Sequence, residues 1–192
     1  MSVAKRSAET ILREAAEAHR ALPEVAADAQ VAAERMVDAL GAGGKIIFCG
    51  NGGSAADAQH LAAEFLGRFM MERNPLPALA LSTNSSTVTA IGNDYGFEQV
   101  FARQLRGLAK RGDVLVGIST SGRSQNVVEA FKVAREIGVV TVSLTGQEGS
   151  ELASLADIAI RAPSPSTPRI QEMHITIGHV MCEIVETAMA GK

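Results

Sequence analysis

Short apolar runs alternate with amphipathic segments along the chain from residue 45 onward. The apolar runs are nearly unbroken, as in 45–49 and 113–118, which is typical of strands that are covered on both faces of a sheet. The segments between them carry apolar residues at intervals of three and four, which predicts helices. We predict strands at 45–49, 77–81, 113–118, 139–144 and 156–161, and helices at 55–69, 97–109, 125–137 and 170–189. Strands that alternate with helices predict an α/β fold, a three-layer sandwich with a mostly parallel five-stranded sheet flanked by helices.

The remaining segments differ in character. The stretch 82–87 is polar, and Asn93-Asp94-Tyr95-Gly96 predicts a turn. The first 41 residues predict two helices, at 2–20 and 24–41, separated at Pro23. These helices are rich in small residues, and two arrangements are open for their apolar faces: another subunit or the chain's own sheet. We expect one domain over 1–192, with the helical pair 1–41 at an oligomer interface.

Composition narrows the classes of partner. The 192 residues carry a net charge of −3, with one Tyr and no Trp, which disfavours a nucleic-acid partner. We expect no membrane span, because no stretch approaches the ~18 apolar residues that one needs. Met1 to Arg20 carries charges throughout, unlike a signal peptide. Cys49 and Cys182 lie in apolar runs and are expected to be buried thiols, which suits a reducing cytoplasm.

Two loops between a predicted strand and a predicted helix could hold a phosphate group. They are Gly50-Asn51-Gly52-Gly53-Ser54 and Ser119-Thr120-Ser121-Gly122-Arg123-Ser124. A helix N-terminus offers free backbone N–H groups to an anion, and glycine allows its close approach. Helix capping by Ser and Asn is the alternative, although the second loop holds more hydroxyl groups than capping requires. Neither loop has the spacing of a nucleoside-triphosphate or dinucleotide motif, so no nucleotide cofactor is expected.

Two histidine-containing segments could move protons. His60 and Glu64 are four residues apart and share one helical face; a surface pair is the alternative. The last predicted helix holds His174 and His179 in an apolar setting, where a core histidine is the alternative, and Gln171 lies near its beginning. A carboxylate and an imidazole with suitable pKa values could catalyse an aldose–ketose isomerisation. A divalent metal could polarise the two adjacent oxygen atoms of the sugar.

Four motifs in order resemble those of the phosphoheptose isomerases, a family of the sugar isomerase (SIS) domain group. They are the segment from Gly50 to His60, then Gly92-Asn93-Asp94-Tyr95-Gly96, Gly117-Ile118-Ser119-Thr120-Ser121-Gly122 and Arg169-Ile170-Gln171-Glu172. The resemblance implies interconversion of sedoheptulose 7-phosphate and D-glycero-D-manno-heptose 7-phosphate for lipopolysaccharide or capsule precursors. It also implies a cytoplasmic homotetramer with active sites between subunits.

The resemblance implies a role for individual residues. Glu64 matches the general base of the family and His179 its second acid–base residue. The zinc ligands of the family correspond to His60, Glu64, Gln171 and His179. Gln171 and His179 are eight residues apart, about 12 Å along a straight helix, so a shared ion requires Gln171 to lie on the preceding turn or loop. The expected substrate contacts are Asn51, Gly52, Gly53, Ser54, Glu64, Asn93, Asp94, Ser119, Thr120, Ser121, Ser124 and Gln171.

Two other functions remain open. Some SIS proteins bind a bacterial replication initiator without turning over sugar, and these lack the catalytic carboxylate and histidine that Glu64 and His179 match. Alternatively, the chain isomerises another phosphosugar, because loops that recognise phosphate do not reveal the length of the sugar. Asn84 stands where many phosphoheptose isomerases carry Asp, which would alter substrate binding if that position contacts the sugar.

Overall fold

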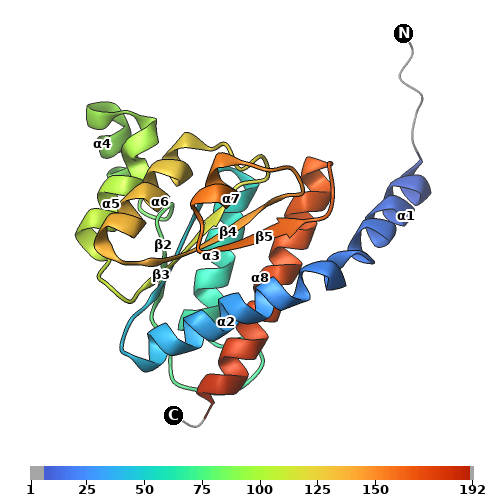
Figure 1. The fold of residues 1–192 in the computed structure, drawn as a ribbon, viewed down its shortest axis with the longest axis horizontal. Helices are drawn as coiled ribbons and strands as arrows, with labels where there is room; N and C mark the ends of the chain where they lie inside the picture. The colour runs from blue at the N-terminus through green and yellow to red at the C-terminus, as the bar shows by residue number, and fades with distance from the viewer. Residues whose placement is uncertain (1–6, 191–192) are drawn as a thin grey trace.

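A five-stranded, fully parallel sheet forms the centre of the computed structural model, which describes residues 7–190 (Figure 1). The strands are β1 (Ile46–Gly50), β2 (Ala78–Ala80), β3 (Val114–Ile118), β4 (Val140–Gly146) and β5 (Ile158–Ala162). Their order in the sheet is β2-β1-β3-β4-β5. β1 and β3 are buried along their whole length, as the unbroken apolar runs indicate. The predicted α/β class and five-stranded sheet are confirmed.

Helices cover both faces of this sheet (Figure 1). They are α1 (Ala8–His19), α2 (Ala26–Gly41), α3 (Gly53–Leu66), α4 (Ser85–Tyr95), α5 (Val100–Leu108), α6 (Gln125–Ile137), α7 (Glu151–Leu155) and α8 (Thr167–Met189), with short 3₁₀ turns at Leu22–Val25 and Phe97–Gln99. One apolar core joins α2, α3 and α8 to the sheet. The other joins α5, α6 and α7 to the opposite face. No helix among residues 7–190 is long and apolar enough to cross a membrane.

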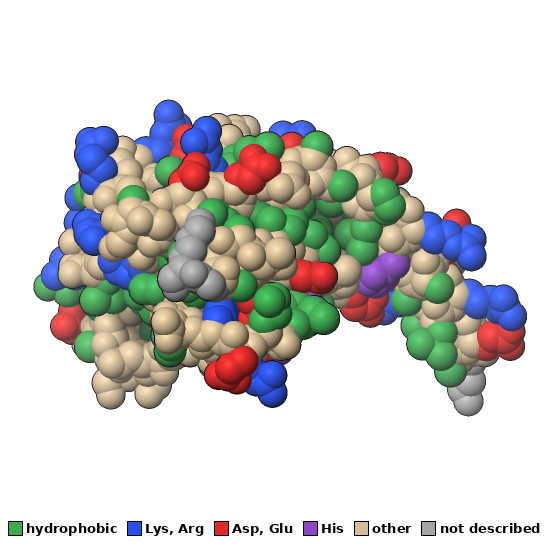
Figure 2. Space-filling view, turned by 90° about the horizontal axis from the view of Figure 1, so that it is seen from below, with side chains coloured by type: hydrophobic (Ala, Val, Ile, Leu, Met, Phe, Trp, Pro, Cys, Tyr) green, Lys and Arg blue, Asp and Glu red, His purple; other side chains and the backbone are tan. Residues whose placement is uncertain are grey.

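The two N-terminal helices behave differently. α2 buries Ala29, Ala32, Ala33 and Met36 and packs mainly on α8. The chain's own core therefore covers the buried face of α2, and the location of the pair 1–41 at an oligomer interface stays a prediction. α1 has no buried residue and projects from the body. Figure 2 shows hydrophobic side chains on this arm and on the adjoining face of the molecule. Residues 2–6 of the first predicted helix lie outside the described part.

Three local predictions were wrong. Residues 85–95 form α4, where we expected a polar stretch and a turn, because the Asn84 side chain caps the helix by accepting a hydrogen bond from the Thr87 N–H. α7 was not predicted, and the Ser150 side chain caps it in the same way. α8 begins at Thr167 rather than at residue 170, because Pro168 occupies the first helical turn, where proline is tolerated. Gln171 therefore lies within the helix.

The sheet order places a topological switch point between β1 and β3. From β1 the chain moves to β2 on one side, and it later returns to β3 on the other side. Gly50 at the end of β1 pairs in register with Ile118 at the end of β3. Open α/β sheets bind ligands outside the carboxyl ends of the strands at such a point. Both predicted phosphate loops begin there.

Candidate functional site

The loop after β3 presents hydroxyl groups that do not cap a helix. Ser124 precedes α6, yet its side chain makes no capping hydrogen bond. Its Oγ instead lies 2.8 Å from Oγ of Ser119, which is buried. Ser121 is exposed, and its Oγ accepts a hydrogen bond from the Arg123 N–H. Simple capping therefore does not account for this group of hydroxyls, which an anion could bind.

A hollow of about 190 Å³ opens beside this loop. Three loops at the carboxyl ends of β3, β4 and β5 and the first turn of α8 line it, through Thr120, Ser121, Gly146, Gln147, Glu148, Ser164, Pro165, Thr167 and Ile170. Thr120, Ser121 and Ile170 belong to motifs of the sequence. No motif marks the other lining residues, so only the position of β4 and β5 in the sheet brings them here. The hollow has room for a small anionic group.

The loop after β1 is short, because α3 begins at Gly53. Gly52 has a φ of +55°, which glycine adopts without strain. A Cβ at Gly53 would lie 2.7 Å from Nε2 of Gln171, so a larger residue there would displace the end of the Gln171 side chain. Ser54 is buried in the first turn of α3, where it packs against Gly50. Asn51 is half-buried and makes hydrogen bonds with Asn126.

A second group of candidate residues lies between α3 and α8. Nε2 of His60 lies 2.9 Å from Nε2 of His179 and 3.4 Å from Oε1 of Glu64. The two imidazole rings meet edge to face, with centroids 5.1 Å apart. The side chain of His60 is 46% exposed and that of Glu64 is 20% exposed, so a substrate could reach both. One carboxylate and two imidazoles therefore surround a partly open point, as acid–base chemistry requires.

These three donors partly fit a zinc ion. Ligand atoms of one tetrahedral zinc lie roughly 3.3 Å apart, close to both distances from His60 Nε2. However, within residues 7–190 no group of three or more His, Cys, Asp or Glu side chains meets the geometry of a metal site. Gln171 is not part of the group, because its side chain packs on Gly53, about 10 Å from His60 along the axis of α3.

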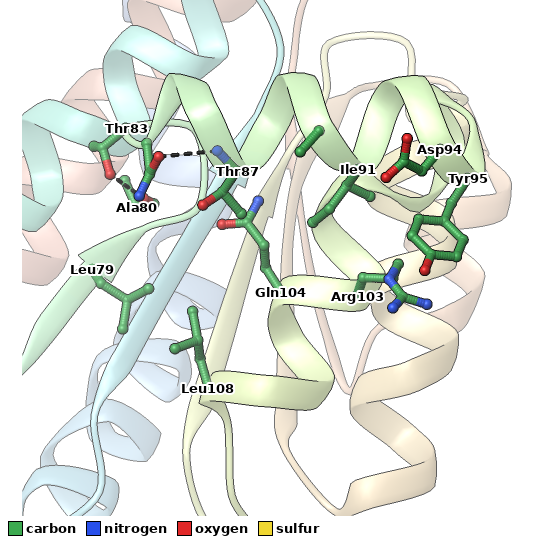
Figure 3. Close-up of a pocket in the computed structure, with 12 residues that line it drawn as sticks. Leu79, Ala80, Thr83, Thr87, Ile91, Asp94, Tyr95, Arg103, Gln104 and Leu108 are labelled. Carbon is green, nitrogen blue, oxygen red and sulfur yellow. Dashed lines mark hydrogen bonds between the residues drawn. The ribbon is translucent and has the colours of Figure 1, made fainter.

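The remaining predicted contacts, Asn93 and Asp94, lie on α4. Asn93 Nδ2 donates a hydrogen bond of 2.8 Å to Asp94 Oδ1, and both residues are exposed. Asp94 lines a larger hollow of about 540 Å³ between α4, α5 and the edge strand β2 (Figure 3). In Figure 3, Arg103 lies under the Tyr95 ring, with its guanidinium carbon 3.6 Å from the ring centroid. None of His60, Glu64 and His179 lines this hollow, so its volume alone does not mark the reacting centre.

His174 is a core histidine, which was one of the two alternatives for this residue. It is fully buried, and its Nε2 lies 3.0 Å from the Thr145 carbonyl oxygen. Burial lowers the pKa of His174 to about 4, although the bond to Thr145 opposes this shift. The ring is therefore neutral near pH 7 and supports the end of β4. Cys49 and Cys182 are also buried, and burial raises the pKa of each thiol to about 12.

A buried ion pair behind His179 was missed in the sequence. Glu186 on α8 accepts hydrogen bonds from the backbone N–H groups of Phe69, Met70 and Met71 and from Nε of Arg73. The Phe69 ring in turn lies 5.3 Å from the His179 ring, between centroids. The pair thus holds the 67–73 loop against one wall of the His–Glu group. No sequence pattern links residues 73 and 186.

Comparisons with known proteins agree on one family. Residues 12–146 match the SIS domain family. The chain is 62% identical over 152 residues to the phosphoheptose isomerase of Nitratidesulfovibrio vulgaris (strain Miyazaki F), covering 79% of this chain and 73% of the relative. It is 53% identical over 172 residues to that of Akkermansia muciniphila, covering 90% and 91%.

Two solved structures share this architecture over more than nine tenths of the chain. The phosphoheptose isomerase from Neisseria gonorrhoeae superposes with a TM-score of 0.85 at 47% identity, covering 93% of this chain and 98% of that structure. The phosphoheptose isomerase from Francisella tularensis superposes with a TM-score of 0.88 at 38% identity, covering 95% and 100%. The likeness therefore includes the regions of α8 and β5 that lie beyond residue 146.

Proposed function

The chain belongs to the SIS domain family, and from this we propose that it interconverts sedoheptulose 7-phosphate and D-glycero-D-manno-heptose 7-phosphate. It is an aldose–ketose isomerase by its identity of 53–62% to phosphoheptose isomerases over most of its length. Heptose units for a lipopolysaccharide or capsule are the expected use of the product. The observation that carries the proposal is the convergence of Glu64, His60 and His179 at one partly open point.

The reaction assigns a separate task to each group of residues. The hydroxyl-rich loop 119–124 holds the phosphate group at the carboxyl end of the sheet. Glu64 takes a proton from C1 of the ketose and returns it to C2, through an enediolate. His179 transfers a proton between the two oxygen atoms, so that O2 gains one as O1 loses one.

We place a zinc ion in the same proposal. His60, Glu64 and His179 would hold it, and a bound zinc ion would polarise the carbonyl and hydroxyl oxygens of the sugar. The short distances from His60 Nε2 to the other two side chains support this assignment. Gln171 packs on Gly53 instead, where it would orient the first loop and the substrate. Chelation should abolish turnover, and full activity of metal-free protein, with zinc below the protein concentration by atomic emission, would exclude the metal.

A cytoplasmic homotetramer with active sites between subunits completes the proposal. Four exposed hydrophobic residues, Leu66, Met70, Met71 and Val180, lie near the His–Glu group in sequence. A neighbouring subunit that covered them would also shield the reacting atoms from water, which strengthens electrostatic interactions there. Sedimentation velocity on the purified protein would distinguish a tetramer from smaller species.

The alternative of a non-catalytic SIS protein has less support. Glu64 and His179 are both retained, and both contact or closely approach His60. The identity to phosphoheptose isomerases likewise supports a seven-carbon substrate over a shorter one. Values of kcat/KM for five-, six- and seven-carbon ketose phosphates would rank these substrates directly.

The deciding experiment follows conversion of sedoheptulose 7-phosphate by NMR. Wild-type protein should produce the aldose, whereas Glu64→Gln should fold normally and lose turnover, because the amide keeps the shape of the side chain but cannot take a proton. Glu34→Gln is the matched control, since Glu34 is exposed on α2 and, among residues 7–190, its side chain bonds only Gln30. Near-normal turnover by Glu64→Gln would remove Glu64 as the base, and an inactive wild-type protein would refute the function.

A further inference from the structure

Asn51 and Asn126 form a closed pair of amides. Asn51 Nδ2 donates to Asn126 Oδ1, and Asn126 Nδ2 donates to Asn51 Oδ1, each over 2.8 Å. Asn126 is only 3% exposed, in the first turn of α6, whereas Asn51 is half-buried directly after β1. The two residues are 75 positions apart in sequence. The pair therefore joins two distant segments by two hydrogen bonds at once.

The location of the pair connects it to ligand binding. Asn51 belongs to the loop after β1, and Asn126 follows the hydroxyl-rich loop after β3. The ends of β1 and β3 are adjacent in register, at Gly50 and Ile118, and the switch point of the sheet lies between them. Ligands of open α/β sheets bind in this crevice. The amide pair thus joins the two loops at the switch point.

The chemistry of the amide group indicates what the pair does to Asn51. An asparagine amide has two N–H donors and two acceptor lone pairs. Asn126 occupies one donor and one lone pair of Asn51, so one of each remains. Two simultaneous bonds fix both the plane of the Asn51 amide and its orientation. The free N–H and lone pair are thereby held ready for a ligand on the side away from Asn126.

We propose that Asn126 is a positioning residue that, through Asn51, locks the loops after β1 and β3 into one rigid substrate cradle. Asn126 itself need not touch the substrate, because its amide is buried and occupied by Asn51. This inference rests on the proposed function, since it takes sedoheptulose 7-phosphate as the ligand. A preorganised cradle spares the substrate the entropic cost of ordering the loops, so the pair should act on binding.

A double-mutant cycle tests the coupling. Binding of sedoheptulose 7-phosphate is measured by calorimetry in the Glu64→Gln background, where turnover does not interfere. Asn126→Ala should raise Kd by about tenfold, since it removes both hydrogen bonds of the pair, and Asn51→Ala should raise Kd at least as much, since it also removes the amide that faces the ligand. The Kd of the double variant should not exceed that of whichever single variant binds more weakly, because the second substitution has no hydrogen bond of the pair left to remove. Should Asn126→Ala not fold, Asn126→Ser takes its place with the same expectation.

Thr141→Val is the matched structural control. Thr141 is fully buried at the opposite end of the sheet, and its Oγ1 also makes two hydrogen bonds, both with Asp157. This variant should lower the melting temperature and leave Kd unchanged. If Asn126→Ala lowers the melting temperature equally and leaves Kd unchanged, the residue is merely structural and the inference fails.

Two further outcomes separate the inference from the function. A double variant whose loss in affinity equals the product of the two single losses would show independent residues and overturn the coupling, while the proposed function stands. If the parent Glu64→Gln protein does not bind sedoheptulose 7-phosphate, and wild type does not convert it, the proposed function fails together with this inference.

Discussion

Replacing Glu186 by Gln should destabilise the protein severely while leaving the shape of the side chain unchanged. The carboxylate accepts three backbone N–H bonds of 2.6–2.9 Å and one bond of 3.1 Å from Arg73 Nε. The side chains of Glu186 and Arg73 are 3% and 4% exposed, so water cannot replace the missing partner. A glutamine amide has one oxygen acceptor, and its NH₂ group would face other N–H donors.

The expected cost follows from the partners that remain. Removing one member of a buried ion pair costs about 3–5 kcal/mol, because the other charge is left uncompensated. The Arg73 guanidinium still donates to the carbonyl oxygens of Glu64, Phe65, Gly67 and Asn74. These bonds partly compensate the charge of Arg73. We therefore expect the free energy of unfolding to fall by an amount near the lower limit, about 3 kcal/mol.

The same ion pair predicts a dependence on pH. Burial raises the pKa of Glu186, but the hydrogen bonds from Met70, Phe69 and Met71 and the charge of Arg73 lower it more, and the net pKa lies below 4.5. Ionised Glu186 therefore stabilises the fold fully above pH 4.5, and this stabilisation is lost as pH falls through the lowered pKa. Wild type and Glu186→Gln should therefore differ most in free energy of unfolding near pH 7, and this difference should become smaller in acid.

Urea unfolding followed by circular dichroism measures this effect, at one fixed protein concentration because subunit association adds to apparent stability. Glu183→Gln is the control, since Glu183 is an exposed glutamate on the same helix and surface changes usually stay within about 0.5 kcal/mol. If Glu186→Gln lowers the free energy of unfolding by less than about 1 kcal/mol, or by an amount that does not depend on pH, the carboxylate of Glu186 does not stabilise the fold as assigned.

Three further substitutions probe the hydroxyl-rich loop 119–124 and the contact between α3 and α8. Ser121→Ala should raise KM for the phosphosugar roughly 5- to 30-fold, equivalent to ~1–2 kcal/mol for a lost hydrogen bond, and steady-state kinetics with an unchanged KM would remove Ser121 from the site. Gly178→Ala should cost about 1–3 kcal/mol of stability, because its Cβ would lie 2.6 Å from a methyl carbon of Leu61 where α8 meets α3. Gly107→Ala on α5, where nothing lies within 4 Å, should instead stabilise by ~0.5–1 kcal/mol; equal effects of the two glycine substitutions in thermal unfolding would contradict this close approach.

The errors in the predicted fold have local causes. α4 was missed because its first residues, Ser85 to Thr89, are weak helix formers, and the helix buries no side chain that would give an apolar stripe. The helix forms because Asn84 caps its N-terminus and α5 packs beside it. By contrast, α6 lies at 125–137 as predicted, because its buried residues recur at helical spacing.

The sequence by itself determined the parts of the protein that depend on neighbouring residues. Apolar runs and helical spacing specify strands and helices locally, a strand followed by a Ser- and Gly-rich loop predicts a phosphate site, and four-residue spacing brings His60 beside Glu64. Tertiary structure alone decided the contacts between segments: His60 with His179, Asn51 with Asn126 and Arg73 with Glu186, all more than 70 positions apart. Such contacts depend on the order of the strands and on how α3 and α8 lie against each other, and no spacing along the chain encodes either.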